Sequence, residues 1–553
     1  MASSPPWLVA VFFLGRVFID TPVVSVHAFV SGDAITFAAA PGAARPPYAL
    51  QSSLLAEPTD TQSIATHGSG GADIDDPGSF NDLTYKENVR ISKLAEKSAR
   101  GDRATAPLAY KILAGLEGLR AADTISYNGV LKAYAKSSAG DAVQWAEKVL
   151  RRMEDVHEDQ REAYRRWENM EEDNGGEDGL ANEAGPPRIT VKPNIRTYST
   201  LLDAYSRHAT RCPPEESEAL LERVWELYEA TGDEGLRPNA FAYNTVLNHW
   251  AKCDRGAEGA LRAADLLEKM ELHNLADIIS YNTVADAWAR SGVDDAGSKA
   301  EAVLRQIIEL EKVKGRRNKI LPNVRTYCCV IDAWSRSTHP ASAQRADRIL
   351  AELESKYELT QDESLQPNQF AFSAVINAYV RSNEEDKASL TLALLRRMED
   401  LWKTGRNVSA RPNIVVYNSV LNACATTRQS TGAVSVPMDI VRTLYNELTS
   451  ETSPASPDHY TYGTVLKACI NLLPTRFEEE DFVRSVFNRC CEDGQVSWLV
   501  GYLLRQAATD EVYRELIPPD VYDPRIGQFE IDKIPRDWRR NVVERRSRRR
   551  SER

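Results

Sequence analysis

The hydrophobic and polar positions of this chain repeat along most of its length. Eight segments start from an aromatic residue, carry Val or Leu three residues later and, apart from His249, carry Ala six residues later. Offsets of this kind fall on one side of an α-helix, so each segment predicts a helix with one packed face. The aromatic residues are Tyr127, Tyr198, Tyr243, Tyr281, Tyr327, Phe372, Tyr417 and Tyr462.

A second amphipathic run follows in each unit, as in ALRAADLLEKM at residues 260–270. Most units then close with Pro followed by Asn or Asp, which suits the end of one helix and the start of the next. Successive aromatic positions are 71, 45, 38, 46, 45, 45 and 45 residues apart. Two helices cannot bury both of their faces alone, so the sequence predicts an all-α solenoid of stacked helix-turn-helix repeats.

Three features resemble pentatricopeptide repeats of the P type: Tyr-Asn-Thr-Val followed by Ala-Trp, a second helix ending in Leu-x-x-Met, and the closing Pro-Asn or Pro-Asp. The resemblance covers residues 124–473 as eight units and implies a right-handed superhelix. Residues 80–123 resemble a degenerate capping repeat, and residues 474–516 a C-terminal helical cap. GQVSWLVGYLL and IPRDWRRNV resemble the ends of such proteins in diatoms and related algae. The units are longer than is usual in this family, and the surplus is expected in loops.

The N-terminal residues look like a targeting segment. WLVAVFFLG, within residues 1–28, is too short to span a bilayer and suits a signal peptide. Residues 29–79 are rich in Ala, Pro, Ser and Gly, as in a disordered transit peptide. The arrangement resembles the bipartite leader of complex plastids, cut between Ala28 and Phe29. A plain secretory signal and mitochondrial import are the alternatives.

Charge and cysteine content refine this outline. The net charge is −12, yet residues 154–186 alone contribute twelve acidic residues and three arginines. This acidic insert is expected to be a solvated loop, with repulsion of non-cognate RNA as the alternative. Residues 517–553 are expected to form a basic tail. The eight cysteines show no C-x-x-C spacing and indicate small buried thiols rather than a disulfide framework or a zinc site.

The family resemblance implies binding of single-stranded RNA in an organelle, one nucleotide per repeat. Each unit would read its base with the residue after the aromatic position and with the Asn or Asp that closes the unit. The pairs and implied bases are Asn128/Asn194 (a pyrimidine, C favoured), Ser199/Asn239 (A), Asn244/Asp277 (U), Asn282/Asn323 (a pyrimidine), Cys328/Asn368 (no assigned base), Ser373/Asn413 (A) and Asn418/Asp458 (U). The implied target, from 5′ to 3′, is Y-A-U-Y-N-A-U. Gly463 can read nothing and would cap the array.

Two residues before each aromatic position lies a side chain that could stack on bases, worth about 1–3 kcal/mol per base. These residues are Ile125, Arg196, Phe241, Ile279, Arg325, Phe370, Val415 and Tyr460.

No catalytic constellation, metal-ligand spacing or cofactor motif is found, so the sequence favours a non-enzymatic protein. The implied role is in RNA stability, processing or translation in a plastid, with the mitochondrion as the alternative. Partners would be single-stranded RNA and proteins of the processing machinery, with no membrane association of the mature form. The rival function is a protein–protein interaction scaffold, because α-solenoids also bind peptides.

Overall fold

The computed structural model describes residues 80–173, 186–315, 320–427, 435–451, 453, 455–473, 479–519, 521–523, 528–529 and 533–542. All of them belong to one compact unit, Asp76–Arg553. The expected leader, the transit segment and the cleavage point after Ala28 lie outside these residues.

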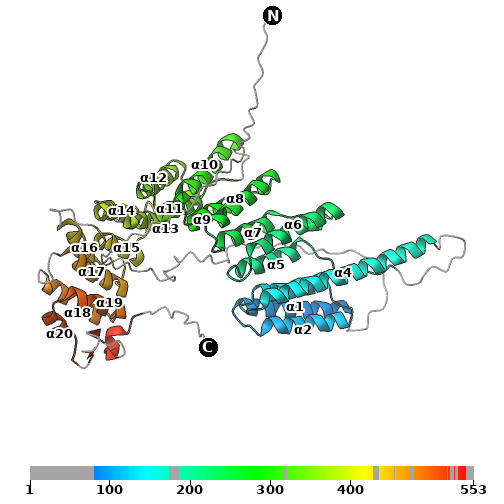
Figure 1. Cartoon of the computed structure of the whole chain (residues 1–553), viewed down its shortest axis with the longest axis horizontal. Coiled ribbons are helices and arrows are strands. Elements are labelled where there is room, and N and C mark those ends of the chain that lie inside the picture. The colour runs from blue at the N-terminus through cyan, green and yellow to red at the C-terminus, as the bar shows by residue number, and fades with distance from the viewer. Residues whose placement is uncertain are drawn as a thin grey trace, which may run out of the picture. The chain divides into compact units, whose positions relative to one another are not determined.

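The described residues form a series of helical hairpins (Figure 1). The first helices of the hairpins are α1 (Phe80–Ala99), α3 (Thr124–Ala135), α5 (Ile195–Arg207), α7 (Ala240–Lys252), α9 (Ile278–Arg290), α11 (Val324–Arg336), α13 (Gln369–Arg381), α15 (Ile414–Ala425), α17 (His459–Leu472) and α19 (Trp498–Ala507). The second helices are α2 (Thr105–Gly118), α4 (Ala142–Asp173), α6 (Pro214–Thr231), α8 (Ala257–Leu272), α10 (Ala296–Lys314), α12 (Ser342–Thr360), α14 (Lys387–Lys403), α16 (Ser435–Thr449), α18 (Glu480–Glu492) and α20 (Asp510–Leu516).

Successive hairpins stack through their first helices. From α1 to α17, each first helix contacts the first helix of the next hairpin. From α3 to α17, each first helix also contacts the second helix before it and the second helix after it. This arrangement buries a continuous core between neighbouring units, as expected for a repeat array. The predicted all-α solenoid of helix-turn-helix repeats is confirmed.

The core is built from the repeated aromatic and small residues. The eight aromatic side chains are buried, from 0% exposed at Tyr127 to 6% at Tyr243. Hydroxyl groups of several of the tyrosines reach carboxylates on second helices: Tyr198 donates to Glu154 (2.8 Å), Tyr327 to Glu352 (3.2 Å) and Tyr417 to Glu399 (2.7 Å). Burial, together with these carboxylates, raises the pKa of each of these tyrosines. The repeat therefore uses tyrosine to combine a packed ring with a satisfied polar end.

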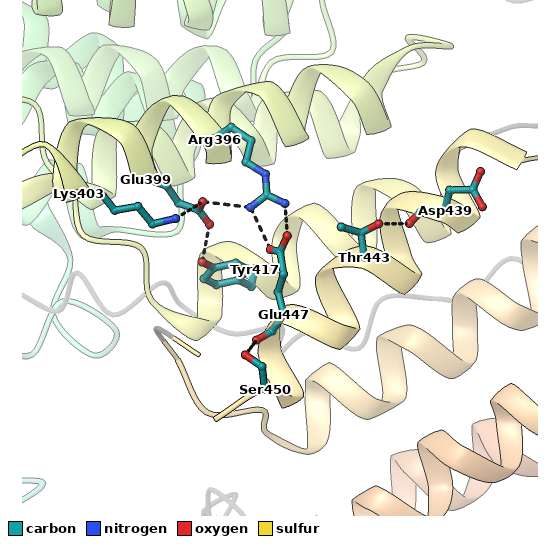
Figure 2. Close-up of polar contacts among 8 residues, drawn as sticks. All are labelled: Arg396, Glu399, Lys403, Tyr417, Asp439, Thr443, Glu447 and Ser450. Atoms are coloured by element: carbon teal, nitrogen blue, oxygen red, sulfur yellow. Dashed lines mark hydrogen bonds and ion pairs between the residues drawn. The ribbon is translucent and has the colours of Figure 1, made fainter. Parts of the chain in front are cut away.

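One such contact belongs to a larger polar network between α14, α15 and α16 (Figure 2). Glu399 is 5% exposed and accepts hydrogen bonds from Tyr417, Arg396 (3.0 Å) and Lys403 (3.1 Å). Arg396 also donates to Glu447 of α16 (2.9 Å). Burial alone would raise the pKa of Glu399, but these three donors outweigh it and hold the pKa below its ordinary value. The buried carboxylate thus stays ionised and joins three helices.

The 45-residue units still end with the closing proline, and part of their extra length lies just before it. In three units a 3-10 turn precedes this proline: η1 (Glu234–Leu236), η3 (Glu363–Leu365) and η4 (Val408–Ala410). Each turn buries its last side chain, which lies two residues before the proline: Leu236, Leu365 and Ala410 are 8%, 7% and 0% exposed. The surplus was expected in loops; part of it forms these turns.

The acidic insert differs from the expected loop. Residues 154–173 continue helix α4, which spans 32 residues. The returning chain is attached to this helix, since Gln160 accepts from the backbone N–H groups of Thr190 (3.0 Å) and Val191 (3.1 Å). Frequent Glu and Arg pairs along the helix, such as Glu162 with Arg166 (2.9 Å), support helical structure. The charged segment is therefore helical in its first part.

The segment expected as a basic tail is folded in part. Residues 522–523 and 528–529 form strands β1 (Tyr522–Asp523) and β2 (Gln528–Phe529), which pair antiparallel. Turn η6 (Arg536–Arg539) packs against α18, where the Trp538 ring meets Phe487 edge-on at 5.8 Å. The backbone N–H of Val496 donates to Trp538 O (2.8 Å). Residues 543–553 lie outside the described part.

Candidate nucleic-acid interface

The residue that closes each unit is the N-cap of the next first helix. Its side-chain oxygen accepts a hydrogen bond from the backbone N–H three residues later, at 2.8 to 3.1 Å in all eight units. Asn and Asp are the residue types that cap best, because a short side-chain oxygen satisfies a free N–H there. With the exception of Asp123, each of these caps is also a residue that the sequence predicts as a base reader. These caps are Asp123, Asn194, Asn239, Asp277, Asn323, Asn368, Asn413 and Asp458.

Two of the predicted reader pairs are joined directly. Asn244 Nδ2 donates to both carboxylate oxygens of Asp277 (3.1 and 3.2 Å), and the Ser280 hydroxyl lies 2.7 Å from Asn244 Oδ1. In the same way, Asn418 Nδ2 donates to Asp458 (3.0 Å) and the Thr461 hydroxyl donates to Asn418 Oδ1 (2.8 Å). Each cluster of Asn, Asp and Ser or Thr fixes which end of the amide faces the carboxylate.

The length of the unit does not alter this geometry. Asn244 and Asp277 are 33 residues apart, whereas Asn418 and Asp458 are 40 residues apart. The hydrogen bonds are nevertheless the same, because the extra residues lie ahead of the closing residue. The longer unit that starts with Asn418 therefore keeps its two predicted readers together.

Units that close with Asn are arranged differently. Among the described residues, Asn128 Oδ1, Ser199 Oγ and Asn282 Oδ1 are buried atoms without a hydrogen-bond partner. Ser199 and Asn282 are 4% and 3% exposed. In the seams facing Asn128 and Asn282, the hydroxyl at the third helical position contacts the cap and not the facing amide oxygen: Thr197 lies 3.3 Å from Asn194, and Thr326 lies 3.2 Å from Asn323. In the two joined seams, the hydroxyls of Ser280 and Thr461 lie within hydrogen-bond distance of both the cap and the amide oxygen. The predicted readers Asn128, Ser199 and Asn282 therefore each keep one oxygen atom that accepts no hydrogen bond from the described chain.

The remaining predicted pairs are only partly brought together. Cys328 Sγ lies 3.8 Å from Asn368 Oδ1, and burial raises the pKa of this thiol to about 12, so it is a neutral, weak donor. The hydroxyl of Ser373 bonds to its own helix at Gln369 O (2.7 Å), while Asn413 Nδ2 donates to Gln369 Oε1 (3.0 Å).

Gly463 stands at the reading position of α17. A Cβ atom at Gly463 would lie 3.3 Å from Leu499 of α19, which fills the position. The structure thus agrees with the expectation that the last unit carries no reader.

The predicted stacking residues lie at the second position of each first helix, next to the cap. Seven of the eight are exposed and Phe370 is partly buried. The apolar ones show large exposed fractions: Ile125 66%, Phe241 47%, Ile279 40%, Val415 54% and Tyr460 55%. Both joined reader pairs therefore lie between two exposed apolar side chains, Phe241 with Ile279 and Val415 with Tyr460.

A column of basic residues was missed by the sequence reasoning. Eight residues after the reading position, and so on the same helix face, lie Lys136, Arg207, Lys252, Arg290, Arg336 and Arg381. The members are close enough to affect one another: burial and the neighbouring Arg290 and Arg207 lower the pKa of Lys252. Burial and Arg336 likewise lower the pKa of Arg381. The constant spacing from the reader was the signal that could have revealed this column.

One reader-like pair was also missed. Asn88 Nδ2 donates to Asp123 (3.1 Å), the cap of the first predicted unit. The segments DTISYN from Asp123 and DIISYN from Asp277 are nearly identical, so Asp123 could have been aligned with Asp277. Asn88 itself lies in a helix without the repeated aromatic pattern and carries no such signal.

Within the described ranges, His, Cys, Asp and Glu side chains form no cluster of three or more that could hold a metal ion. None of the described helices combines the length and apolar character needed to cross a bilayer. The row of first helices carries amide and carboxylate groups at the seams and exposed apolar side chains beside them. Basic side chains lie eight residues after the reading positions.

These features define a repeat solenoid with amide and carboxylate groups and exposed apolar side chains at the seams between units. No family model matches the sequence, and no curated protein matches it. Solved structures do match: the crystal structure of the pentatricopeptide repeat protein PPR10 from maize aligns with 79% of this chain at 19% sequence identity, a TM-score of 0.42 and a probability of 1.00. The match covers 54% of the maize chain, so this chain spans about half the length of that structure.

Proposed function

We propose that this protein binds single-stranded RNA along the row of first helices, with one base read at each seam. The observation that carries the proposal is the direct hydrogen bonding of predicted readers across a seam, Asn244 with Asp277 and Asn418 with Asp458. These residues lie far apart in sequence, in units of different length, and the sequence pattern pairs the same residues.

The joined pairs present a defined pattern of donors and acceptors. With one N–H on the Asp carboxylate and Oδ1 on a Ser or Thr hydroxyl, the Asn amide keeps a second N–H and a second lone pair for a ligand. The ionised carboxylate can only accept. A base edge with an imino N–H between two carbonyl oxygens complements this set, which supports uracil at the third and seventh positions of the target.

The surroundings of the readers support a nucleic-acid ligand. Exposed apolar side chains on both sides of a reader, such as Phe241 and Ile279, can stack on the faces of one base. The basic column on the same helix face can neutralise backbone phosphates. Three of its members, Arg207, Arg290 and Arg336, are paired with Asp203 (2.7 Å), Asp286 (3.0 Å) and Asp332 (2.9 Å), which limits non-specific attraction.

The biological setting that we propose rests on the sequence alone. We infer that the protein acts in RNA stability, processing or translation in a plastid, with the mitochondrion as the alternative, and that it works with proteins of the processing machinery. The leader-like residues 1–79 motivate this part of the proposal. Fluorescence microscopy of a fusion carrying these residues would test it, and retention of the fusion in the cytosol would contradict it.

Binding is tested with the full chain and labelled RNA carrying Y-A-U-Y-N-A-U, against a scrambled RNA of the same composition. The double variant Asn244→Ser with Asp277→Asn should move the preference at the third nucleotide from U to A, because it copies the Ser199/Asn239 pair. Asn at position 277 still caps α9, so the fold is retained. A single base change is expected to alter affinity about 5- to 100-fold.

The outcomes separate the two candidate functions. Equal affinity for the target and the scrambled RNA would contradict the assignment of bases to seams. Absence of any RNA binding by a correctly folded protein would overturn the proposal in favour of a protein-interaction scaffold, which does not require base readers at the seams.

A further inference from the structure

The first hairpin, α1 and α2, was expected to act only as a cap, yet it carries a polar cluster at its seam with α3. Asn88 Nδ2 donates to Asp123 Oδ1 (3.1 Å) and Oδ2 (3.3 Å). The Ser126 hydroxyl lies 2.7 Å from Asn88 Oδ1, and the Ser126 backbone N–H is capped by Asp123 (2.8 Å). Both Asn88 and Asp123 are partly exposed.

This cluster reproduces the two joined reader pairs. In the cluster of Asn244, Asp277 and Ser280, the corresponding distances are 3.1 and 3.2 Å from amide to carboxylate, and 2.7 Å from hydroxyl to amide oxygen. The sequence separation of Asn88 and Asp123 is 35 residues, between the 33 and 40 of the other two pairs. The orientation of the Asn88 amide is therefore fixed in the same way, with one N–H and one lone pair left over.

The side chains on either side of this cluster also resemble those beside the two joined reader pairs. Tyr85 lies three residues before Asn88, just as Phe241 lies three residues before Asn244. Tyr85 is 69% exposed, and Ile125, on the other side of the seam, is 66% exposed. A hydrogen-bond cluster that served only to hold α1 against α3 would not need two large, uncovered apolar side chains beside it. An aromatic ring of this kind is a stacking surface for a base.

We propose that the seam between α1 and α3 binds one further base, with Asn88 and Asp123 as its readers and Tyr85 and Ile125 stacking on its two faces. Because the pair is Asn with Asp, the base is uracil. The site lies before the first predicted unit, so the base is 5′ to the target and extends it to U-Y-A-U-Y-N-A-U. This inference rests on the proposed function and deepens it.

The test uses the full chain and four RNAs that differ only in the nucleotide 5′ to Y-A-U-Y-N-A-U. Wild-type protein is expected to bind the RNA with U at this position about 5- to 100-fold more tightly than the other three. The variant Asn88→Ser with Asp123→Asn should prefer A there instead. Asn retains the cap of α3, and unchanged preferences at the other positions would show that the fold is intact.

A matched control is the same double exchange at Asn244 and Asp277. If that control changes the preference at the third nucleotide while wild-type protein is indifferent to the added 5′ nucleotide, the inference is wrong and the proposed function stands. If neither wild-type protein nor the variants bind RNA, the proposed function itself fails. Substitution Tyr85→Ala gives an independent measure: it should weaken binding of the eight-nucleotide RNA and leave binding of the seven-nucleotide RNA unchanged.

Discussion

At the scale of single residues, the closing residue of a unit determines which side chains form hydrogen bonds at its seam. Where it is Asp, as at Asp277, the carboxylate takes an N–H from the reading Asn and the neighbouring hydroxyl reaches the amide oxygen. Where it is Asn, as at Asn194, the hydroxyl of Thr197 turns to the cap and Asn128 Oδ1 has no partner within the described chain. A buried acceptor without a donor costs about 1–3 kcal/mol, so a ligand that supplies a donor is favoured there.

This difference predicts cytosine rather than uracil opposite Asn128, because the amino group of cytosine is a donor and the corresponding O4 of uracil is an acceptor. The substitution Asn194→Asp should convert the seam to the arrangement of Asn418, Asp458 and Thr461 and move the preference at the first nucleotide of Y-A-U-Y-N-A-U from C to U. Affinities for two RNAs that differ only at this nucleotide provide the measurement, with the preference at the third nucleotide as the control. An unchanged C preference in the variant would show that the closing residue does not set the base.

At the scale of elements, close packing between helices sets what each position tolerates. Gly297 in the first turn of α10 lies against the ring of Trp334 in α11, and a Cβ atom there would lie 2.5 Å from Cε3 of that ring. Gly115 in α2 is a contrasting case, because a Cβ atom there would meet no atom within 4 Å. Both residues lie within helices, so they separate the effect of packing from that of helix propensity.

The substitution Gly297→Ala is expected to destabilise the array by about 1–3 kcal/mol, since Trp334 must shift in a filled core. Gly115→Ala is expected to be neutral or to stabilise by up to about 1 kcal/mol, because alanine favours the helix and nothing opposes the added methyl group. Urea unfolding followed by circular dichroism compares the two variants with the parent protein. Equal effects of both substitutions would contradict the close contact at Trp334.

At the scale of the whole molecule, stability is distributed over many similar interfaces, several of which bury tyrosine hydroxyls or thiols. All eight cysteines are free in the structure. Burial raises the pKa of Cys424 and Cys469 to about 12, and it also raises the pKa of the buried tyrosines. These groups hold their protons in the folded chain at pH values where the unfolded chain has lost them.

The raised thiol pKa values make the free energy of unfolding depend on pH. A free thiol ionises near pH ~8.5, so above this pH the folded state binds more protons than the unfolded state and the free energy of unfolding falls as pH rises. The midpoint of urea unfolding should therefore begin to decrease above about pH 8.5 and fall further toward about pH 12, which are the unfolded and the folded thiol pKa values. The variant Cys424→Ala with Cys469→Ala should show a smaller decrease. Identical pH profiles for the variant and the parent would contradict the raised thiol pKa values.

The sequence by itself determined the local structure of this protein. The offsets between Tyr281, Val284 and Trp288 fix a helix face, and Pro-Asn at Pro322 and Asn323 fixes where one helix stops and the next is capped. These features depend on residues a few positions apart, which is why the helices and the buried aromatic residues could be predicted.

Only the tertiary structure decided which groups meet across a seam. That Asn244 and Asn418 bond to the closing residue while Ser373 bonds to its own helix depends on how two hairpins dock, and the spacing along the chain does not encode this. For the same reason Asn88 was not predicted. Its helix lacks the repeated pattern, but it packs on α3 as each other first helix packs on the next first helix. Helix periodicity is a short-range property, whereas a base-binding site at a seam is made by two helices that are joined only in three dimensions.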